Sequence, residues 1–303
     1  MLHKRAPRFF ILLCAVLISG ATSVAWAAPG TKPATKSAER PAKADESQRM
    51  NGEALYKATL ADAEKGQPRA MLNVGILNEQ GIGVPRNFTK ALEWWQKAAD
   101  AGEKEALLRV ALCYEVGMGT KADMGKAVSN LQKAAELNYA PAQHRLAGFY
   151  LNGRGVPKDE AKGMDLLKKA AGAGDLTALF ELGIVQRDGF FGQKAEPDKA
   201  RATFRKAAEA GHAGAALAFA AMTREGKGGK AEPETALTWY LIAQKAGLRG
   251  EALEEVIKEL KKPLSKKQIA EAESTANERI ATWTAAAKQR ESGGQPTAIA
   301  PSR

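Results

Sequence analysis

A glycine, replaced once by asparagine, recurs at a nearly constant interval and restricts the possible folds more than any other feature. The positions are Gly66, Gly102, Asn138, Gly174, Gly211 and Gly247. Successive members are 36, 36, 36, 37 and 36 residues apart. A fixed period of this length is typical of stacked helical hairpins, in which each repeat packs against its neighbours. The spacing predicts five repeats, at about residues 66–101, 102–137, 138–173, 174–210 and 211–246.

Glycine also marks the end of the first helix within each repeat, where the chain must turn toward the second. These positions are Gly81, Gly117, Gly153, Gly189 and Gly226. Glycine, and to a lesser degree asparagine, tolerates the left-handed backbone conformation in which many α-helices end. We therefore predict structural roles at both columns, for Gly81, Gly102, Gly117, Asn138, Gly153, Gly174, Gly189, Gly211 and Gly226.

A polar column precedes the second helix of each repeat and contains Asn87, Asp123, Asp159, Glu196 and Glu232. Asparagine and aspartate side chains cap the free backbone N–H groups of a helix, and glutamate does so poorly. Both glutamates are followed by proline, which is favoured at the first helical position. The column therefore predicts where the second helix begins in all five repeats.

Apolar columns predict the core between the helices. A small residue recurs on the first helix, at Ala70, Ala106, Ala142, Ala178 and Ala215. One large residue recurs on the second helix, at Trp95, Leu131, Leu167, Phe204 and Tyr240. Small residues let helices approach closely, and one large residue per repeat fills the layer between them. The pattern therefore predicts an all-α protein with one continuous stacked core.

The combined columns resemble the Sel-one-like repeat (SLR) family, a branch of the tetratricopeptide-like solenoids. In the third repeat the resemblance rests on Ala142, Leu146, Tyr150, Gly153, Gly155, Val156, Asp159, Lys162, Lys169, Ala170 and Ala171. It covers about residues 66–247 and implies a right-handed α-solenoid of five helix-turn-helix repeats. Repeats four and five depart from the Gly-x-Gly-Val turn at residues 189–194 and 226–230, which leaves the geometry of these two loops open.

The first 27 residues have the three parts of a secretory signal peptide. Three basic residues precede a short apolar run at residues 9–18, and Ala-Trp-Ala at 25–27 matches a small-x-small cleavage site. We expect cleavage after Ala27 and a periplasmic protein with no membrane span after cleavage. An uncleaved anchor remains the alternative, although the apolar run is short for a bilayer.

The segments that flank the repeats differ in composition from them. Residues 28–48 are rich in Ala, Pro, Lys, Thr and Ser, which predicts a disordered linker. Weak contact between the lysines of this linker and anionic envelope polymers stays an open alternative. Residues 49–65 have helical spacing and predict an N-terminal capping helix. Residues 248–287 predict C-terminal capping helices, the last starting at Ser265 with Gln268 in a capping box. Residues 288–303 predict a disordered tail.

No catalytic, cofactor-binding or metal-binding pattern occurs in the sequence. Beyond the leader, Cys113 is the only cysteine, and its repeat column is apolar, which predicts a packed thiol rather than a nucleophile. His144 and His212 lie far apart without a cysteine or carboxylate cluster, so we expect no metal site. The alternative is a cell-wall or β-lactam-related hydrolase, an activity associated with exported relatives that carry cysteine pairs absent from this chain.

The charge and the family resemblance both bear on the expected partners. The chain carries 45 Lys and Arg against 34 Asp and Glu, a net charge of +11. These charges are scattered and no aromatic–basic platform occurs, so we expect no nucleic-acid binding. The resemblance implies a non-enzymatic scaffold or adaptor, and exported bacterial members are associated with signalling, exopolysaccharide regulation and envelope complexes.

Candidate protein-binding residues come from one polar column of the first helix, which the resemblance places on the concave side. The column reads Asn73, Arg109, Arg145, Glu181 and Ala218, and its first four members are the candidates. We expect Arg109 and Arg145 to receive two carboxylates of a partner. The alternative is an ordinary solvated surface. Phe190 and Phe191, adjacent on a loop, form a second candidate anchor, and the alternative that they pack back onto the solenoid stays open.

Overall fold

The computed structural model describes residues 44–292, which form thirteen α-helices and no β-strand. The helices are α2 (Ala44–Glu64), α3 (Pro68–Gln80), α4 (Phe88–Asp100), α5 (Lys104–Val116), α6 (Met124–Glu136), α7 (Ala140–Asn152), α8 (Glu160–Gly172), α9 (Leu176–Asp188), α10 (Pro197–Glu209), α11 (Ala213–Glu225), α12 (Pro233–Lys245), α13 (Glu251–Lys261) and α14 (Lys266–Ser292). The expected signal peptide, the linker up to residue 43 and the tail beyond residue 292 lie outside the described residues.

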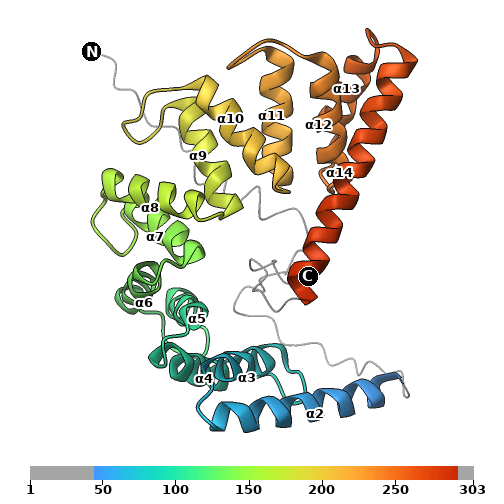
Figure 1. Ribbon diagram of the computed structural model, residues 1–303. Coiled ribbons are helices and arrows are strands. Elements are labelled where there is room, and N and C mark those ends of the chain that lie inside the picture. Colours follow the sequence, from blue (N-terminus) through green and yellow to red (C-terminus); the bar gives the residue numbers. More distant parts are fainter. Residues whose placement is uncertain (1–43, 293–303) are drawn as a thin grey trace, which may run out of the picture.

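Five helical hairpins stack in sequence order to form the predicted solenoid. The first helices of the repeats are α3, α5, α7, α9 and α11, and the second helices are α4, α6, α8, α10 and α12. The main contacts join consecutive helices, with α2 on α3 at one end and α13 and α14 on α12 at the other. Figure 1 shows the repeats following a curve, and α14 running beside α12 at its end.

Every first helix ends in the left-handed conformation at the predicted glycine. The backbone φ angles at Gly81, Gly117, Gly153, Gly189 and Gly226 lie between 66° and 77°. The column that closes each repeat is also left-handed, with φ of 55° at Asn138 and 86° to 107° at the glycines. Both helices of each repeat are therefore terminated by a residue in the left-handed conformation.

The loop between the two helices keeps one hydrogen bond in all five repeats. The N–H of the residue before the second helix donates to a carbonyl near the end of the first, as in Asp159 to Tyr150 at 2.9 Å. In repeat four, where the turn sequence departs, Glu196 still donates to the carbonyl of Gln186. The inserted residue is accommodated by Phe191 and Gly192, which both adopt positive φ. The unusual loop thus starts and ends as the others do.

The second helices begin as the polar column predicts. Asn87, Asp123 and Asp159 each accept a hydrogen bond from the backbone N–H three residues on. Glu196 and Glu232 form no side-chain cap, and proline occupies the start of both helices. The two solutions lead to helices of the same length, 13 residues.

The core couples a large residue on the second helix to a small residue on the first. The indole of Trp95 lies against Gly75, where an added Cβ would be 2.3 Å from its Nε1. Phe204 lies against Gly183 in the same way, with an added Cβ 2.6 Å from its Cε1. The same two positions of repeats two and three hold alanine with leucine, Ala111 with Leu131 and Ala147 with Leu167. Residue sizes therefore compensate between the two helices in repeats one to four, whereas repeat five combines Ala220 with Tyr240.

The capping helices are longer than predicted at both ends of the solenoid. Helix α2 begins at Ala44 rather than at residue 49, and α14 ends at Ser292 rather than at 287. The added residues include no glycine or proline and are mainly good helix formers, so helix propensity extends both elements. The predicted capping box at the start of α14 is present, since Gln268 N–H donates to Ser265 Oγ and Ser265 N–H donates to Gln268 Oε1.

Candidate protein-binding surface

The polar column of the first helices places its residues at different depths. Asn73 on α3 is exposed, whereas Arg145 on α7 and Glu181 on α9 are partly buried. Only 17% of the Arg109 side chain on α5 is exposed. The column therefore lies along one side of the first helices, but its two arginines are less open than the sequence suggests.

The guanidinium group of Arg109 is held by two carboxylates of the chain itself. It lies 3.3 Å from Glu79 on α3 and 3.3 Å from Glu105 on its own helix. Arg69 of α3 reaches the other oxygen of the buried Glu105 at 2.7 Å. Because Glu105 is shared by two arginines, these contacts join the first helices of repeats one and two.

Arg145 repeats this arrangement one unit further along. Its guanidinium lies 2.6 Å from Glu115 of α5, and Arg154 reaches the same carboxylate at 2.8 Å. Only 3% of the Glu115 side chain is exposed. Arg145 and Arg154 are themselves 38% and 54% exposed, and each compensates the buried charge of Glu115. Arg145 therefore stabilises the contact between repeats two and three.

In the next repeat the column itself holds a carboxylate, Glu181, and its partner is a histidine from the position before Arg145. His144 of α7 lies 2.9 Å from the Glu181 carboxylate of α9 through Nε2. Burial disfavours the charged imidazole, but the hydrogen bond and charge of Glu181, with the charge of Asp175, hold the pKa of His144 above its ordinary value. We name the residues Arg69, Glu79, Glu105, Arg109, Glu115, His144, Arg145, Arg154 and Glu181 the charge ladder.

The charge ladder was not part of the prediction, although the sequence contains a signal for it. Arg109 follows Glu79 by 30 residues, and Arg145 follows Glu115 by 30 residues. A separation that recurs in step with the repeat places the two charges on facing helices in both cases. The predicted pair Arg109 and Arg145 is therefore already occupied by carboxylates of this chain.

The phenylalanines of the fourth loop pack back onto the solenoid. Phe190 and Phe191 are partly buried and contact the main hydrophobic core. Their ring centroids lie 6.3 Å apart at an interplanar angle of 58°. The alternative left open by the sequence is thus the arrangement seen, and the two rings are not fully exposed anchors.

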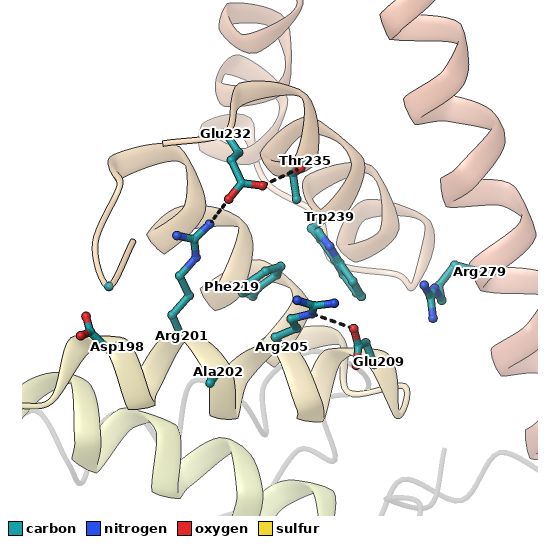
Figure 2. A pocket seen from close by; sticks show the side chains of 11 residues that line it. Asp198, Arg201, Ala202, Arg205, Glu209, Phe219, Glu232, Thr235, Trp239 and Arg279 are labelled. Carbon is teal, nitrogen blue, oxygen red and sulfur yellow. Dashed lines mark hydrogen bonds and ion pairs between the residues drawn. The ribbon is translucent and has the colours of Figure 1, made fainter. Parts of the chain in front are cut away.

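A pocket of about 530 Å³ lies at the other end of the solenoid, on the side of the second helices. Figure 2 shows its lining residues, which come from α10, α11, α12, the loop before α12, and α14. They are Asp198, Arg201, Ala202, Arg205, Glu209, Phe219, Gly228, Glu232, Thr235, Trp239 and Arg279. None of these residues belongs to the predicted column.

The cysteine and the second histidine, which are potential catalytic residues, have structural roles in the fold. Burial, with the charge of nearby Glu79, raises the pKa of the Cys113 thiol to about 12. Nδ1 of His212 accepts a hydrogen bond from Ala215 N–H and caps α11. Among residues 44–292, no group of three or more His, Cys, Asp or Glu side chains is arranged to hold a metal ion. Over the same range, none of the helices has both the length and the apolar character that crossing a membrane requires.

Comparison with known proteins gives matches to repeat proteins of this type. A family model described as Sel1 repeat matches residues 68–103, 104–139, 140–175, 176–212 and 215–248. No curated protein matches the chain.

Solved structures of repeat proteins from several bacteria also match the chain. A Sel1 repeat protein from Oxalobacter formigenes is 25% identical with a TM-score of 0.62, and the match covers 76% of this chain and 99% of that one. A putative Sel1 repeat protein from Klebsiella pneumoniae is 25% identical with a TM-score of 0.43, covering 68% and 99%. A protective antigen of uropathogenic Escherichia coli that displays an SLR fold is 20% identical with a TM-score of 0.34, covering 86% and 74%.

Proposed function

Because the chain belongs to the Sel1 repeat family, we propose that it is a non-enzymatic periplasmic scaffold in envelope signalling or assembly. It binds partner proteins through the first-helix face of the solenoid, which includes Asn73, Arg109, Arg145 and Glu181. The Sel1 repeat fold is typical of protein–protein interaction. The observation that carries the proposal is the charge ladder, because it presents charges of both signs on successive first helices at fixed positions.

Ordered charges of this kind favour selective binding. The carboxylates of Glu105 and Glu115 hold the arginines in place before any partner arrives, so less side-chain freedom is lost on association. A partner whose charges alternate in the same register gains complementary contacts, and one with the wrong register meets like charges. Arg109 and Arg145 thus define the charge pattern, and exposed positions such as Asn73 supply direct contact.

The chemistry of the described side chains supports a binding role rather than a hydrolytic one. A thiol is a nucleophile as its thiolate, and the raised pKa of Cys113 keeps it protonated at neutral pH. His144 is paired with Glu181 and His212 caps a helix, so neither stands beside a nucleophile as a free base. The signal-peptide pattern at residues 1–27 supports export.

The proposal is tested by affinity capture from periplasmic extract, with the purified chain as bait and quantitative mass spectrometry of what it retains. The face variant combines Asn73→Lys with Arg145→Gln, where glutamine can still donate a hydrogen bond to Glu115. The matched control combines Ser129→Lys with Lys133→Gln on exposed positions of α6, so that the charge change is the same. We expect a defined protein to be retained by the parent and the control and lost by the face variant.

Two results would contradict the proposal. Equal retention by the face variant and the control would exclude the first-helix face as the contact. Turnover of nitrocefin or peptidoglycan by the purified chain would show that it is an enzyme of the hydrolase type.

A further inference from the structure

One position of the second helix changes character in repeat four. The column holds Leu92, Val128, Met164, Arg201 and Leu237 in repeats one to five. Val128, Met164 and Leu237 are buried. In repeat four a guanidinium group stands in place of these apolar side chains, and the residue beside it, Ala202, is the smallest in its own column. The pocket lies at the junction of repeats four and five, where this column changes character.

Arg201 forms one wall of the pocket and fixes the loop above it. Its guanidinium donates to the carbonyl of Lys230 at 3.0 Å and to Glu232 at 2.7 Å, and only 12% of its side chain is exposed. It also lies 5.8 Å from the ring centroid of Phe219. The floor is aromatic, since Phe219 and Trp239 meet edge to face with centroids 5.5 Å apart. These contacts give the pocket a defined shape.

Two other arginines, Arg205 and Arg279, line the pocket and form weaker interactions within the chain than Arg201 does (Figure 2). Arg205 of α10 pairs with Glu209 along its own helix at 2.8 Å, but its side chain is 64% exposed. Exposed pairs of this kind contribute only about 0.3–0.5 kcal/mol, so the pair is easily exchanged. Arg279 reaches in from α14 and lies 5.6 Å from the Trp239 ring centroid, without an ion pair among residues 44–292. A partly buried cation stacked on an indole remains able to accept a carboxylate.

We propose that this pocket, here named the α10–α14 pocket, binds an acidic side chain of a partner polypeptide. The carboxylate lies between Arg205 and Arg279, and an adjoining apolar group lies over the edge of Trp239. The inference rests on the proposed function in that the chain binds polypeptides, and it adds a second contact, on the side of the second helices. Guanidinium groups bind carboxylates through charge-assisted hydrogen bonds, which are the strong class of such bonds.

The other charges of the pocket favour a single carboxylate over a polyanion. Asp198 and Glu232 line the end near Arg201, and Glu209 lies beside Arg205. A chain of closely spaced phosphates would place several negative charges against these carboxylates, and like charges at close range oppose binding. A single glutamate or aspartate takes the place of Glu209 on Arg205 and also contacts Arg279 and the indole of Trp239. The pocket chemistry therefore selects an acidic peptide segment.

The test is selection of a random heptapeptide library, displayed on phage, on the immobilised full chain. Enriched peptides are then synthesised, and their affinity is measured by fluorescence polarisation for the parent, for Arg205→Glu with Arg279→Glu, and for Arg205→Gln with Arg279→Gln. The glutamine pair keeps the aliphatic stems, in case charge reversal disturbs the packing of α14. The matched control is Lys206→Glu with Lys288→Glu, which changes the same charges at exposed positions of the same two helices.

We expect the enriched peptides to share an acidic residue next to an apolar one. Affinity should fall at least about tenfold in both arginine variants and remain unchanged in the lysine control. Replacing the acidic residue of the peptide by its amide should lower the affinity for the parent to the same extent.

Three outcomes overturn this inference: no enriched peptide, enriched peptides without acidic residues, or equal affinity for the parent and both arginine variants. Inorganic polyphosphate that binds in an arginine-dependent way where the peptides do not would also overturn it. Capture of a periplasmic protein by the first-helix face is a separate readout, so the proposed function stands or falls independently.

Discussion

Replacing Gly183 by alanine should reduce stability even though alanine is the better helix former. The new Cβ would lie 2.6 Å and 2.7 Å from two ring carbons of Phe204. Carbon atoms in contact normally lie about 3.5–4.0 Å apart, so the ring or the helix must move by about 1 Å. Overpacking of this kind costs about 1–3 kcal/mol. The gain in helix propensity is about 1 kcal/mol. The net loss should be about 1 kcal/mol and at most about 2.

The same contact predicts that a second substitution rescues the first. Phe204→Leu alone should lower stability by about 1–2 kcal/mol, less than the about 3–5 typical of truncation to alanine. Combined with Gly183→Ala, it recreates the alanine–leucine pairs of repeats two and three, Ala111 with Leu131 and Ala147 with Leu167. The added methyl group then fills space left by the smaller side chain. We expect a favourable coupling free energy of about 1–2 kcal/mol.

The four proteins are compared by urea unfolding, followed by circular dichroism at the helical band. The account predicts that the double variant is at least as stable as the less stable single variant. If the two losses simply add, the size compensation between the helices does not govern packing in this core and the reasoning fails. Gly148→Ala serves as a control, because no atom lies within 4 Å of its added Cβ beyond its own helix and chain neighbours.

Four other predictions follow from single sites. Gly153 has φ of 66°, and a β-branched residue resists that conformation, so Gly153→Val should lower the free energy of unfolding by at least about 1–2 kcal/mol; an unchanged melting temperature would refute this. The thiol of Cys113, with a pKa of about 12, should react with a disulfide reagent only after unfolding, and fast reaction of the native chain would contradict its burial. The pKa of His144 is raised, so its pairing stabilises the fold below the unfolded pKa and is lost as pH rises through the folded value. His144→Gln should therefore destabilise more at about pH 6 than at about pH 9. Burial lowers the pKa of His212, so the stability that the neutral imidazole contributes is lost as pH falls. His212→Asn keeps a capping acceptor that does not titrate, so the free energy of unfolding of this variant should fall less steeply at acidic pH.

The repeat architecture was predictable because it depends on backbone requirements that leave a clear trace in sequence. A left-handed helix end selects glycine almost alone, as at Gly153, and an unpaired helix start selects a short polar side chain, as at Asp159. The ends of α2 and α14 were less predictable. Helix propensity changes gradually there, and no glycine or proline marks Ala44 as a boundary.

The candidate surfaces were harder to predict because pairing and burial depend on more than one repeat. Arg109 and Arg145 could be placed on one face from their column, but their pairing with Glu79 and Glu115 required comparison across a 30-residue separation. The pocket was not predicted at all, because Arg279 lies outside the repeats and its position depends on how α14 packs. The sequence did contain one signal for the pocket, which is that arginine occupies position 201 in an otherwise apolar column.

Site-specific photocrosslinking in the cells that produce the protein tests the central claim most directly. A photoreactive amino acid at Asn73, which is exposed on α3, would form covalent bonds with whatever occupies the first-helix face. The same amino acid at Ser129, exposed on α6, is the control. The account predicts a discrete adduct at position 73 and not at 129, in the periplasmic fraction and on a chain that lacks residues 1–27. No adduct at position 73, or the same adduct at both positions, would contradict the proposal that this face binds a partner protein.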